Sequence, residues 1–248
     1  MHPEICKFGF ITVHSYGLLL ATGFLVAIFL ITKKCKIFNI DSQLIIDLSI
    51  WLLIGGIIGG RLLHVIVNIK FYLNNPLEII MIQHGGLAYQ GGLVLSVFCG
   101  WLFLKKKKIA FLPIADLLIP YVALGQSVGR IGCFLNGCCY GKVTNSILGM
   151  KFPQLLYSVY PTQLYYSLAW LGSFVTLNLI YERSRFSGQI FCLYFIFYGF
   201  IRFLIDFLRG DLCRIWLGLN LTQLISLFFI IFFVCFYVWL KQNAKKNT

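Results

Sequence analysis

Residues 14–36 read HSYGLLLATGFLVAIFLITKKCK. The stretch contains no Asp, Glu, Lys or Arg before Lys33. Its uncharged part is long enough for a helix to cross the hydrocarbon core of a bilayer, which is about 30 Å thick. Apolar runs of similar length recur along the chain, with short polar segments between them. The sequence therefore predicts an all-α integral membrane protein, a bundle of about seven transmembrane helices.

The composition also favours a membrane environment. Of the 248 residues, 59% are hydrophobic and 12% are charged, whereas about 25% of the residues in soluble domains are charged. The formal net charge of +13 would also suit a nucleic-acid-binding protein. In a membrane protein, however, basic loops set the topology. We therefore expect contact with membrane lipid and no nucleic-acid partner.

The basic clusters between the predicted spans indicate the orientation of the chain. The spans are expected at residues 14–32, 44–67, 86–104, 112–130, 162–181, 188–208 and 219–240. Clusters of Lys and Arg follow the odd-numbered spans, at residues 33–36, 105–108, 183–185 and 241–246. Because basic loops stay in the cytoplasm, the N-terminus is expected in the periplasm and the C-terminus in the cytoplasm.

This orientation makes the chain one polytopic membrane domain, residues 1–248, with outer-side loops at about 68–85 and 131–161. The N-terminal residues MHPEICKFGF lack the basic region and the small-residue cleavage site of a signal peptide. The first apolar run is therefore expected to be the first span.

Three predicted spans carry an arginine at a similar depth near the outer leaflet. Arg61 lies in the outer third of the second span, Arg130 at the outer end of the fourth and Arg202 in the outer half of the sixth. Charged side chains inside a membrane usually face a cavity and have a function. For Arg209, which lies further out, snorkelling to the interface is an equal alternative.

The sixth span carries Tyr198, Arg202, Asp206 and Arg209 within an arc of about 80° on a helix. Arg202 and Asp206 are spaced to form an i,i+4 ion pair. This pair either has a structural role only or belongs to the wall of a polar cavity that receives an anion. Guanidinium groups bind phosphate in a planar, bidentate manner, and the phosphate at this depth belongs to a phospholipid headgroup.

Two glycine-rich stretches flank the first outer loop. IGGIIGGR, residues 54–61, has the small-xxx-small spacing that lets helices approach closely. HGGLAYQGG, residues 84–92, favours irregular backbone beside a cavity, to which His84 and Gln90 would contribute polar groups. A merely solvated His84 is an equal alternative.

Cysteines cluster in GRIGCFLNGCCYG, residues 129–141. The spacing of Cys133, Cys138 and Cys139 is not that of a zinc site, so no metal is predicted, whereas a disulfide involving one of them stays open. The glycines and Asn136 favour a bent, tightly packed segment that presents Arg130.

Several motifs, taken together, resemble the bacterial prolipoprotein diacylglyceryl transferases over nearly the whole chain. The most specific is GRIGCFLNGCCYG, which resembles the family signature. It is accompanied by SYGLLLATG around Tyr16, GGRL around Arg61, HGGLAYQGG, YPTQLY at 160–165 and YGFIRFLIDFLR from Tyr198.

The resemblance implies an enzyme of the bacterial cytoplasmic (inner) membrane. It would move the diacylglyceryl group of phosphatidylglycerol onto the lipobox cysteine thiol of a prolipoprotein, forming a thioether and releasing glycerol phosphate, without a cofactor. The catalytic residues implied are Arg130, Arg202, Tyr16 and Asp206. The lipid-binding residues implied are Arg130, Arg61, Asn136, Gly141, Tyr198 and Gln90.

Four positions depart from the family pattern. Gln90 stands where well-studied members have a histidine that was proposed as the base for the thiol, and Tyr160 replaces a second histidine common in the family. Cys133 and Cys138 stand where an asparagine and a glutamate are common. Candidates for the base are then His84, Asp206 and the departing phosphate. We expect His84→Ala to leave substantial activity and Arg130→Ala to abolish it.

Three alternatives stay open from the sequence. An anion transporter would need polar groups through the full membrane depth, but these cluster in the outer half. A membrane thiol oxidoreductase would typically need a C-x-x-C pair, which the chain lacks. A diverged family member that uses another lipid or acceptor is favoured by the departures at the histidine positions.

Overall fold

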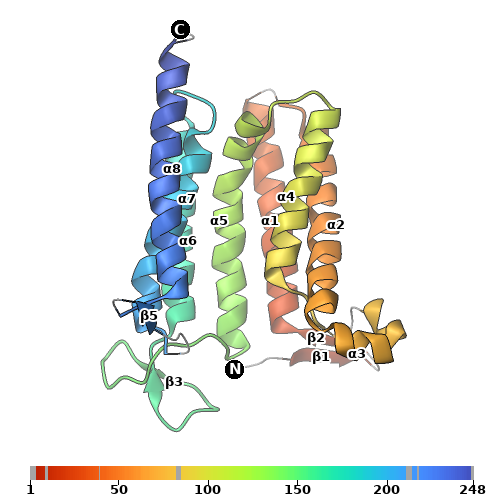
Figure 1. Ribbon diagram of the computed structural model, residues 1–248, viewed down its shortest axis with the longest axis vertical. Helices are drawn as coiled ribbons and strands as arrows, with labels where there is room; N and C mark the ends of the chain where they lie inside the picture. The colour runs from red at the N-terminus through yellow and green to blue at the C-terminus, as the bar shows by residue number, and fades with distance from the viewer. Residues whose placement is uncertain are drawn as a thin grey trace. The chain divides into compact units, whose positions relative to one another are not determined.

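The computed structural model describes residues 4–8, 11–38, 40–81, 85–210, 214–216 and 218–246. Its helices are α1 (Ser15–Ile37), α2 (Ser42–Val67), α3 (Ile69–Asn74), η1 (Pro76–Ile79), α4 (Tyr89–Lys106), α5 (Phe111–Leu135), α6 (Thr162–Tyr181), α7 (Gln189–Ile205), η3 (Asp206–Leu208) and α8 (Leu221–Lys246) (Figure 1). Three antiparallel two-stranded ribbons pair β1 (Glu4–Phe8) with β2 (Ile11–His14), β3 (Met150–Lys151) with β4 (Ser158–Val159), and β5 (Arg214–Trp216) with β6 (Leu219–Asn220).

A long helix overlaps each of the seven predicted spans. Five helical stretches are long and apolar enough to cross a membrane, namely α1, α2, α5, α7 with η3, and α8. Many Leu, Ile, Val and Phe side chains on these helices are exposed. Soluble monomers rarely expose contiguous apolar surface on this scale. The structure therefore supports an integral membrane protein, with a count of seven spans remaining a prediction.

The chain divides into two compact units, residues 1–31 with 112–248, and residues 32–111. In the second unit, α2 packs on α4 through the predicted glycine face. A Cβ atom on Gly55 would lie 3.0 Å from the Leu95 carbonyl oxygen, and one on Gly92 would lie 2.8 Å from the Gly56 carbonyl oxygen. A Cβ atom on Gly59 would clash with the Gly91 carbonyl oxygen, so no larger residue fits there, and the predicted packing role is confirmed for Gly55 and Gly59.

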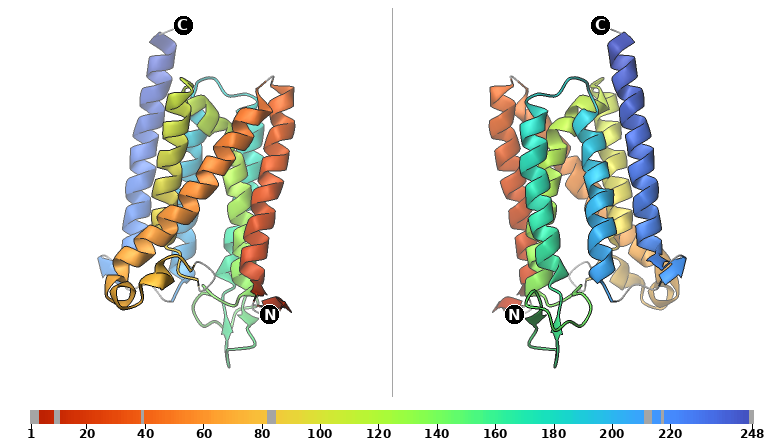
Figure 2. Two further views of the ribbon diagram at one scale, coloured as in Figure 1. Left: turned by 90° about the vertical axis from the view of Figure 1, so that its right-hand side faces the viewer. Right: turned by 90° about the vertical axis from the view of Figure 1, so that its left-hand side faces the viewer.

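In the first unit, aromatic side chains form much of the contact between α6, α7 and α8, which run side by side in Figures 1 and 2. Trp170 of α6 lies 5.7 Å from Tyr194 and from Tyr198 of α7 between ring centroids. Phe195 of α7 stacks on Phe233 of α8 with centroids 4.3 Å apart. These rings fix α7, the helix that carries Arg202, between its two neighbours.

Two polar contacts attach α5 to this group of helices. Ser127 and Ser167 hydrogen-bond each other's backbone carbonyls, at 2.8 and 3.0 Å. The buried Asp116 accepts hydrogen bonds from the backbone N–H groups of Gly188, at 2.6 Å, and Phe191, at 2.8 Å. Asp116 thus satisfies donors at the N-terminus of α7 that the helix itself leaves unpaired.

We expect Asp116→Ala to destabilise the protein by about 1–3 kcal/mol, because two buried N–H groups lose their acceptor. In detergent, this loss would lower the thermal midpoint by roughly 2–4 °C per kcal/mol. Asp47→Ala is the matched control, since the partner of Asp47 among the described residues is the exposed Gln43 side chain. Equal midpoints for the two variants would contradict a capping role for Asp116.

Candidate active site

Arg130 lies on α5, five residues before its last residue, Leu135. Its guanidinium carbon is 4.4 Å from the centroid of the Tyr166 ring on α6. A guanidinium over an aromatic face is attracted by the negative charge density of the ring. The ring therefore orients Arg130 without neutralising its charge.

Asp206 is the buried acceptor of the site, with 2% of its surface exposed. One carboxylate oxygen accepts a hydrogen bond from the Tyr166 hydroxyl at 2.8 Å, and the other accepts from the Thr222 hydroxyl of α8. Arg202 Nε lies 3.7 Å from this second oxygen. The predicted Arg202–Asp206 ion pair is confirmed, and it is connected to both α6 and α8.

Arg202 keeps part of its surface accessible, because 25% of its side chain is exposed whereas none of the Asp206 side chain is. Its Nη1 donates a hydrogen bond to the Tyr198 hydroxyl at 3.3 Å. Arg130 and Arg202 are thus connected by a series of contacts through the Tyr166 side chain and the Asp206 carboxylate. The excess positive charge suits an anionic ligand such as a phosphate.

The turn after Arg130 explains the glycine and cysteine motif. The N–H of Gly137 donates to the Phe134 carbonyl and that of Cys138 to the Cys133 carbonyl. Gly137 has a φ of 70°, so these two bonds form a Schellman motif that ends α5. The predicted bend is confirmed, and only a glycine takes this conformation without strain.

Cys133, Cys138 and Cys139 are free thiols. Hydrogen bonds from the other two thiols and from Asn136 lower the pKa of the Cys138 thiol, because they stabilise its thiolate. Within the described ranges, no group of three or more His, Cys, Asp or Glu side chains could hold a metal ion.

Gly141 and Lys142 contact the backbone of Tyr160 and of η3, which follows α7. The N–H of Gly141 donates to the Tyr160 carbonyl at 2.8 Å, and the N–H of Lys142 donates to the Leu208 carbonyl at 2.7 Å. A Cβ atom on Gly141 would lie 2.6 Å from the Leu208 carbonyl oxygen, so no side chain fits there. Gly141 is therefore a packing position beside the turn that carries Asp206.

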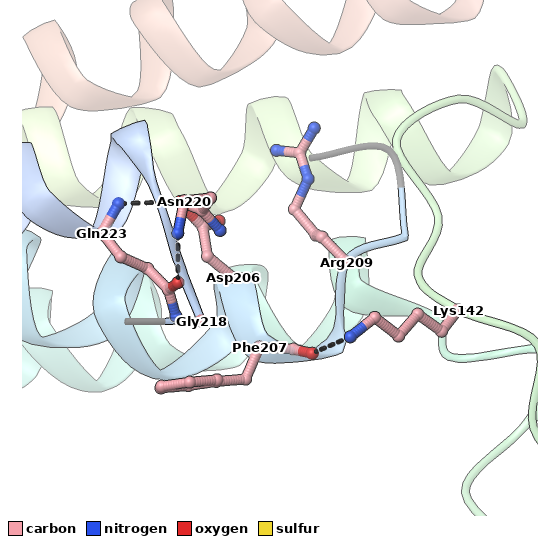
Figure 3. A pocket seen from close by; sticks show the side chains of 7 residues that line it. All are labelled: Lys142, Asp206, Phe207, Arg209, Gly218, Asn220 and Gln223. Atoms are coloured by element: carbon pink, nitrogen blue, oxygen red, sulfur yellow. Dashed lines mark hydrogen bonds between the residues drawn. The ribbon is translucent and has the colours of Figure 1, made fainter. Parts of the chain in front are cut away.

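A small cavity of about 30 Å³ lies beside this contact (Figure 3). Its lining residues are Lys142, Asp206, Phe207, Arg209, Gly218, Asn220 and Gln223. The Lys142 ammonium donates to the Phe207 carbonyl at 2.9 Å, as Figure 3 shows. The cavity has room for water but not for a lipid headgroup.

Tyr16 lies near Arg130 in space, and Asn136 lies near it in the sequence. Tyr16, in the first turn of α1, packs against Gly132, where an added Cβ atom would lie 3.2 Å from Tyr16 Cδ2. Asn136 follows the last residue of α5 and is exposed. Tyr16 thus contacts α5 two residues after Arg130, and Asn136 lies six residues after Arg130 in the sequence.

Arg61, in the second unit, is 7% exposed. Its Nε donates to the Ile79 carbonyl at 3.0 Å, and its two terminal nitrogens donate to the carbonyls of Glu78, Met81, Gly85 and Gly86. An arginine has five N–H donors, and all five have backbone partners here. In this conformation Arg61 holds the segment before α4 and has no donor left for a lipid.

Gln90 is exposed in the first turn of α4. His84 lies outside the described residues, so its candidacy as a base stays a prediction. Tyr166 and Thr222 were not predicted as site residues. Tyr166 lies just after the YPTQLY motif, but nothing in the sequence pattern distinguishes it from Tyr165.

The protein-family model described as prolipoprotein diacylglyceryl transferase matches residues 3–239. The chain belongs to this family. Among similar curated proteins, the phosphatidylglycerol–prolipoprotein diacylglyceryl transferase of Clostridium tetani is 38% identical over 236 residues, which cover 93% of this chain and 94% of that protein. The enzyme of the same name from Finegoldia magna is 36% identical over 244 residues, covering 96% of this chain and 95% of the relative. The match to the Clostridium novyi enzyme, 34% identical over 257 residues, covers 100% of this chain and 98% of the relative. The chain is thus a transferase by its family.

Proposed function

We propose that this family member transfers the diacylglyceryl group of phosphatidylglycerol to the lipobox cysteine of a prolipoprotein. The bond between the diacylglyceryl carbon and the phosphate oxygen breaks, and that carbon forms a bond to the cysteine sulfur. The proton of the thiol goes to a base. The products are a diacylglyceryl thioether and glycerol phosphate. The observation that carries this proposal is the pair of arginines, Arg130 and Arg202, connected through Tyr166 and a single carboxylate.

The charge of the site fits the leaving group. As the carbon–oxygen bond breaks, negative charge accumulates on the phosphate, and preorganised cations stabilise it in the transition state. Two arginines whose positions are already fixed by other side chains reorganise little during the reaction. Arg130 and Arg202 are therefore the residues that we propose to contact the phosphate.

Asp206 is less suited to act as the base for the thiol. Its side chain is fully buried, and both oxygens already accept hydrogen bonds. We propose that Asp206 positions Arg202 instead. The departing phosphate or His84 then takes the proton, helped by the positive surroundings, which lower the pKa of a thiol from its usual value of about 8.5.

The remaining predicted residues have proposed roles that follow their positions. Tyr16, Tyr198 and Asn136 would contact the lipid headgroup around the two arginines. Gly141 would shape the site by packing. Arg61 would organise the segment before α4, since its donors are used there, and Gln90 would line the lipid path.

We also propose the finer membrane arrangement. All seven long helices would cross the bacterial cytoplasmic membrane, with the N-terminus in the periplasm and the C-terminus in the cytoplasm. Basic residues in the last turns of α1, α4 and α8 agree with this orientation under the positive-inside rule. Fusing a periplasm-active reporter to either end of the chain would test the assignment.

The cysteine cluster discriminates the transferase from a thiol oxidoreductase. We expect the triple variant Cys133→Ser, Cys138→Ser, Cys139→Ser to keep transfer activity within about tenfold of wild type, because serine retains the size and hydrogen-bonding capacity of cysteine. Conversion of a model prolipoprotein peptide measures this. An oxidoreductase would lose all activity in the same variant.

Complementation tests the proposed function itself. The chain is expressed in a bacterial strain depleted of its own diacylglyceryl transferase, and a model lipoprotein is examined by mass spectrometry. We expect a diacylglyceryl-modified cysteine. An unmodified cysteine despite good expression would argue against the proposal, and a different mass addition would point to another lipid donor.

A further inference from the structure

Tyr166 contacts both halves of the site through different parts of its side chain. Its ring face lies under the Arg130 guanidinium, with the Arg130 Cζ atom 4.4 Å from the ring centroid. Its hydroxyl donates to Asp206 Oδ1 at 2.8 Å. The residue itself is 2% exposed, so neither contact competes with bulk water.

Apolar neighbours also hold the Tyr166 ring in place. Tyr166 belongs to the buried cluster of α5, α6 and α7 that contains Ile119, Ala123 and Trp170. A buried ring packed among apolar neighbours changes its position only at a cost in packing energy. Packing therefore fixes the positions of both the Tyr166 hydroxyl and its ring face within the site.

This arrangement solves an electrostatic problem of the site. Two arginines that serve one phosphate repel each other before the ligand binds, and a carboxylate beside each would neutralise the charge that the ligand needs. An aromatic face attracts a guanidinium yet leaves its charge intact. Asp206 supplies the single carboxylate, and its partners direct it toward Arg202.

We propose that Tyr166 is a positioning residue that sets the spacing of the two phosphate-binding arginines, with its ring orienting Arg130 and its hydroxyl orienting Arg202 through Asp206. The inference rests on the proposed function, because it assigns both arginines to the phosphate of the lipid. It goes further in assigning separate roles to the two parts of one side chain.

Two substitutions separate these roles. Tyr166→Phe keeps the ring and removes the hydroxyl, so we expect kcat to fall about tenfold, the size of one lost hydrogen bond to a charged group, while the KM for phosphatidylglycerol stays within about twofold. Tyr166→Leu also removes the ring, so we expect the KM for the lipid to rise about fivefold in addition, as a cation–π contact is lost. Tyr165→Phe is the matched control, since in the described part of the chain its hydroxyl donates to the Leu148 carbonyl.

A double-mutant cycle distinguishes positioning from a purely structural role. If the hydroxyl acts through Asp206, Tyr166→Phe should cost less than about twofold in an Asp206→Asn background. A structural role would produce the same loss in both backgrounds, at an unchanged KM, and would overturn the inference. Equal kcat and KM for wild type, Tyr166→Phe and Tyr166→Leu would overturn it as well.

Lipid binding provides a readout that does not depend on turnover. Purified protein is incubated with phosphatidylglycerol, and the retained lipid is measured by native mass spectrometry. Weaker retention by Tyr166→Leu than by Tyr166→Phe supports the inference, and equal retention contradicts it. A wild-type chain that retains the lipid but forms no diacylglyceryl-cysteine would instead contradict the proposed function alone.

Discussion

Replacing Arg130 with alanine should lower kcat/KM for phosphatidylglycerol by about 10³-fold, the loss typical of removing a preorganised donor to a developing negative charge. Arg130→Lys should retain more activity but still lose about 30-fold, because lysine keeps the charge without the planar, stacking guanidinium. The measurement is formation of diacylglyceryl peptide in phosphatidylglycerol vesicles.

His84→Ala is the companion variant, and we expect it to keep substantial activity. Thermal unfolding of each variant in detergent controls for misfolding. If Arg130→Ala stayed within tenfold of wild type, or if only the His84 variant were inactive, the phosphate role of Arg130 would be wrong.

The second large effect is expected for Gly141→Ala. The added Cβ atom would lie 2.6 Å from the Leu208 carbonyl oxygen and 2.9 Å from both Thr162 Cγ2 and Tyr160 Cβ. Because one of these atoms belongs to the backbone and another to a Cβ position, the clash is relieved only by moving residues 141–142 away from η3. We expect a cost of about 1–3 kcal/mol in stability.

We expect the transfer activity of Gly141→Ala to fall by about 100-fold, in addition to the loss of stability. The reason is that the hydrogen bond from the Lys142 N–H to the Leu208 carbonyl holds the turn that contains Asp206. Gly172→Ala is the matched control, since nothing lies within 4 Å of its added Cβ atom. In a helix, this change should be neutral or stabilise by up to about 1 kcal/mol. Indistinguishable midpoints and rates for the two alanine variants would refute the packing argument.

Local sequence patterns predicted the helices well. The predicted fifth span, 162–181, coincides with α6, and the ends of the others lie within six residues of the ends of their helices. The length of an apolar run and its polar boundaries are properties of neighbouring residues, so they are readable without the fold. The Arg202–Asp206 pair and the glycine turn at 137 are local for the same reason.

The hydrogen-bond partners of buried side chains could not be predicted from local sequence patterns. Arg61 was predicted to bind the lipid, and in the structure its donors bind carbonyls 17 to 25 residues further along the chain. Its spacing in α2 gave no indication of this, because the segment that it holds has no regular pattern. Sequence alone showed a buried charge and left open what would satisfy it.

The sequence by itself determined that this is a helical membrane protein of the diacylglyceryl transferase family, with arginines on the helices that form its site. Only the tertiary structure decided that Tyr166 joins Arg130 to Asp206. The hydrogen bond from Tyr166 to Asp206 spans 40 residues of sequence, and it exists because α5, α6 and α7 pack together. Periodicity shows which side of a helix is polar, whereas helix packing decides which polar groups meet.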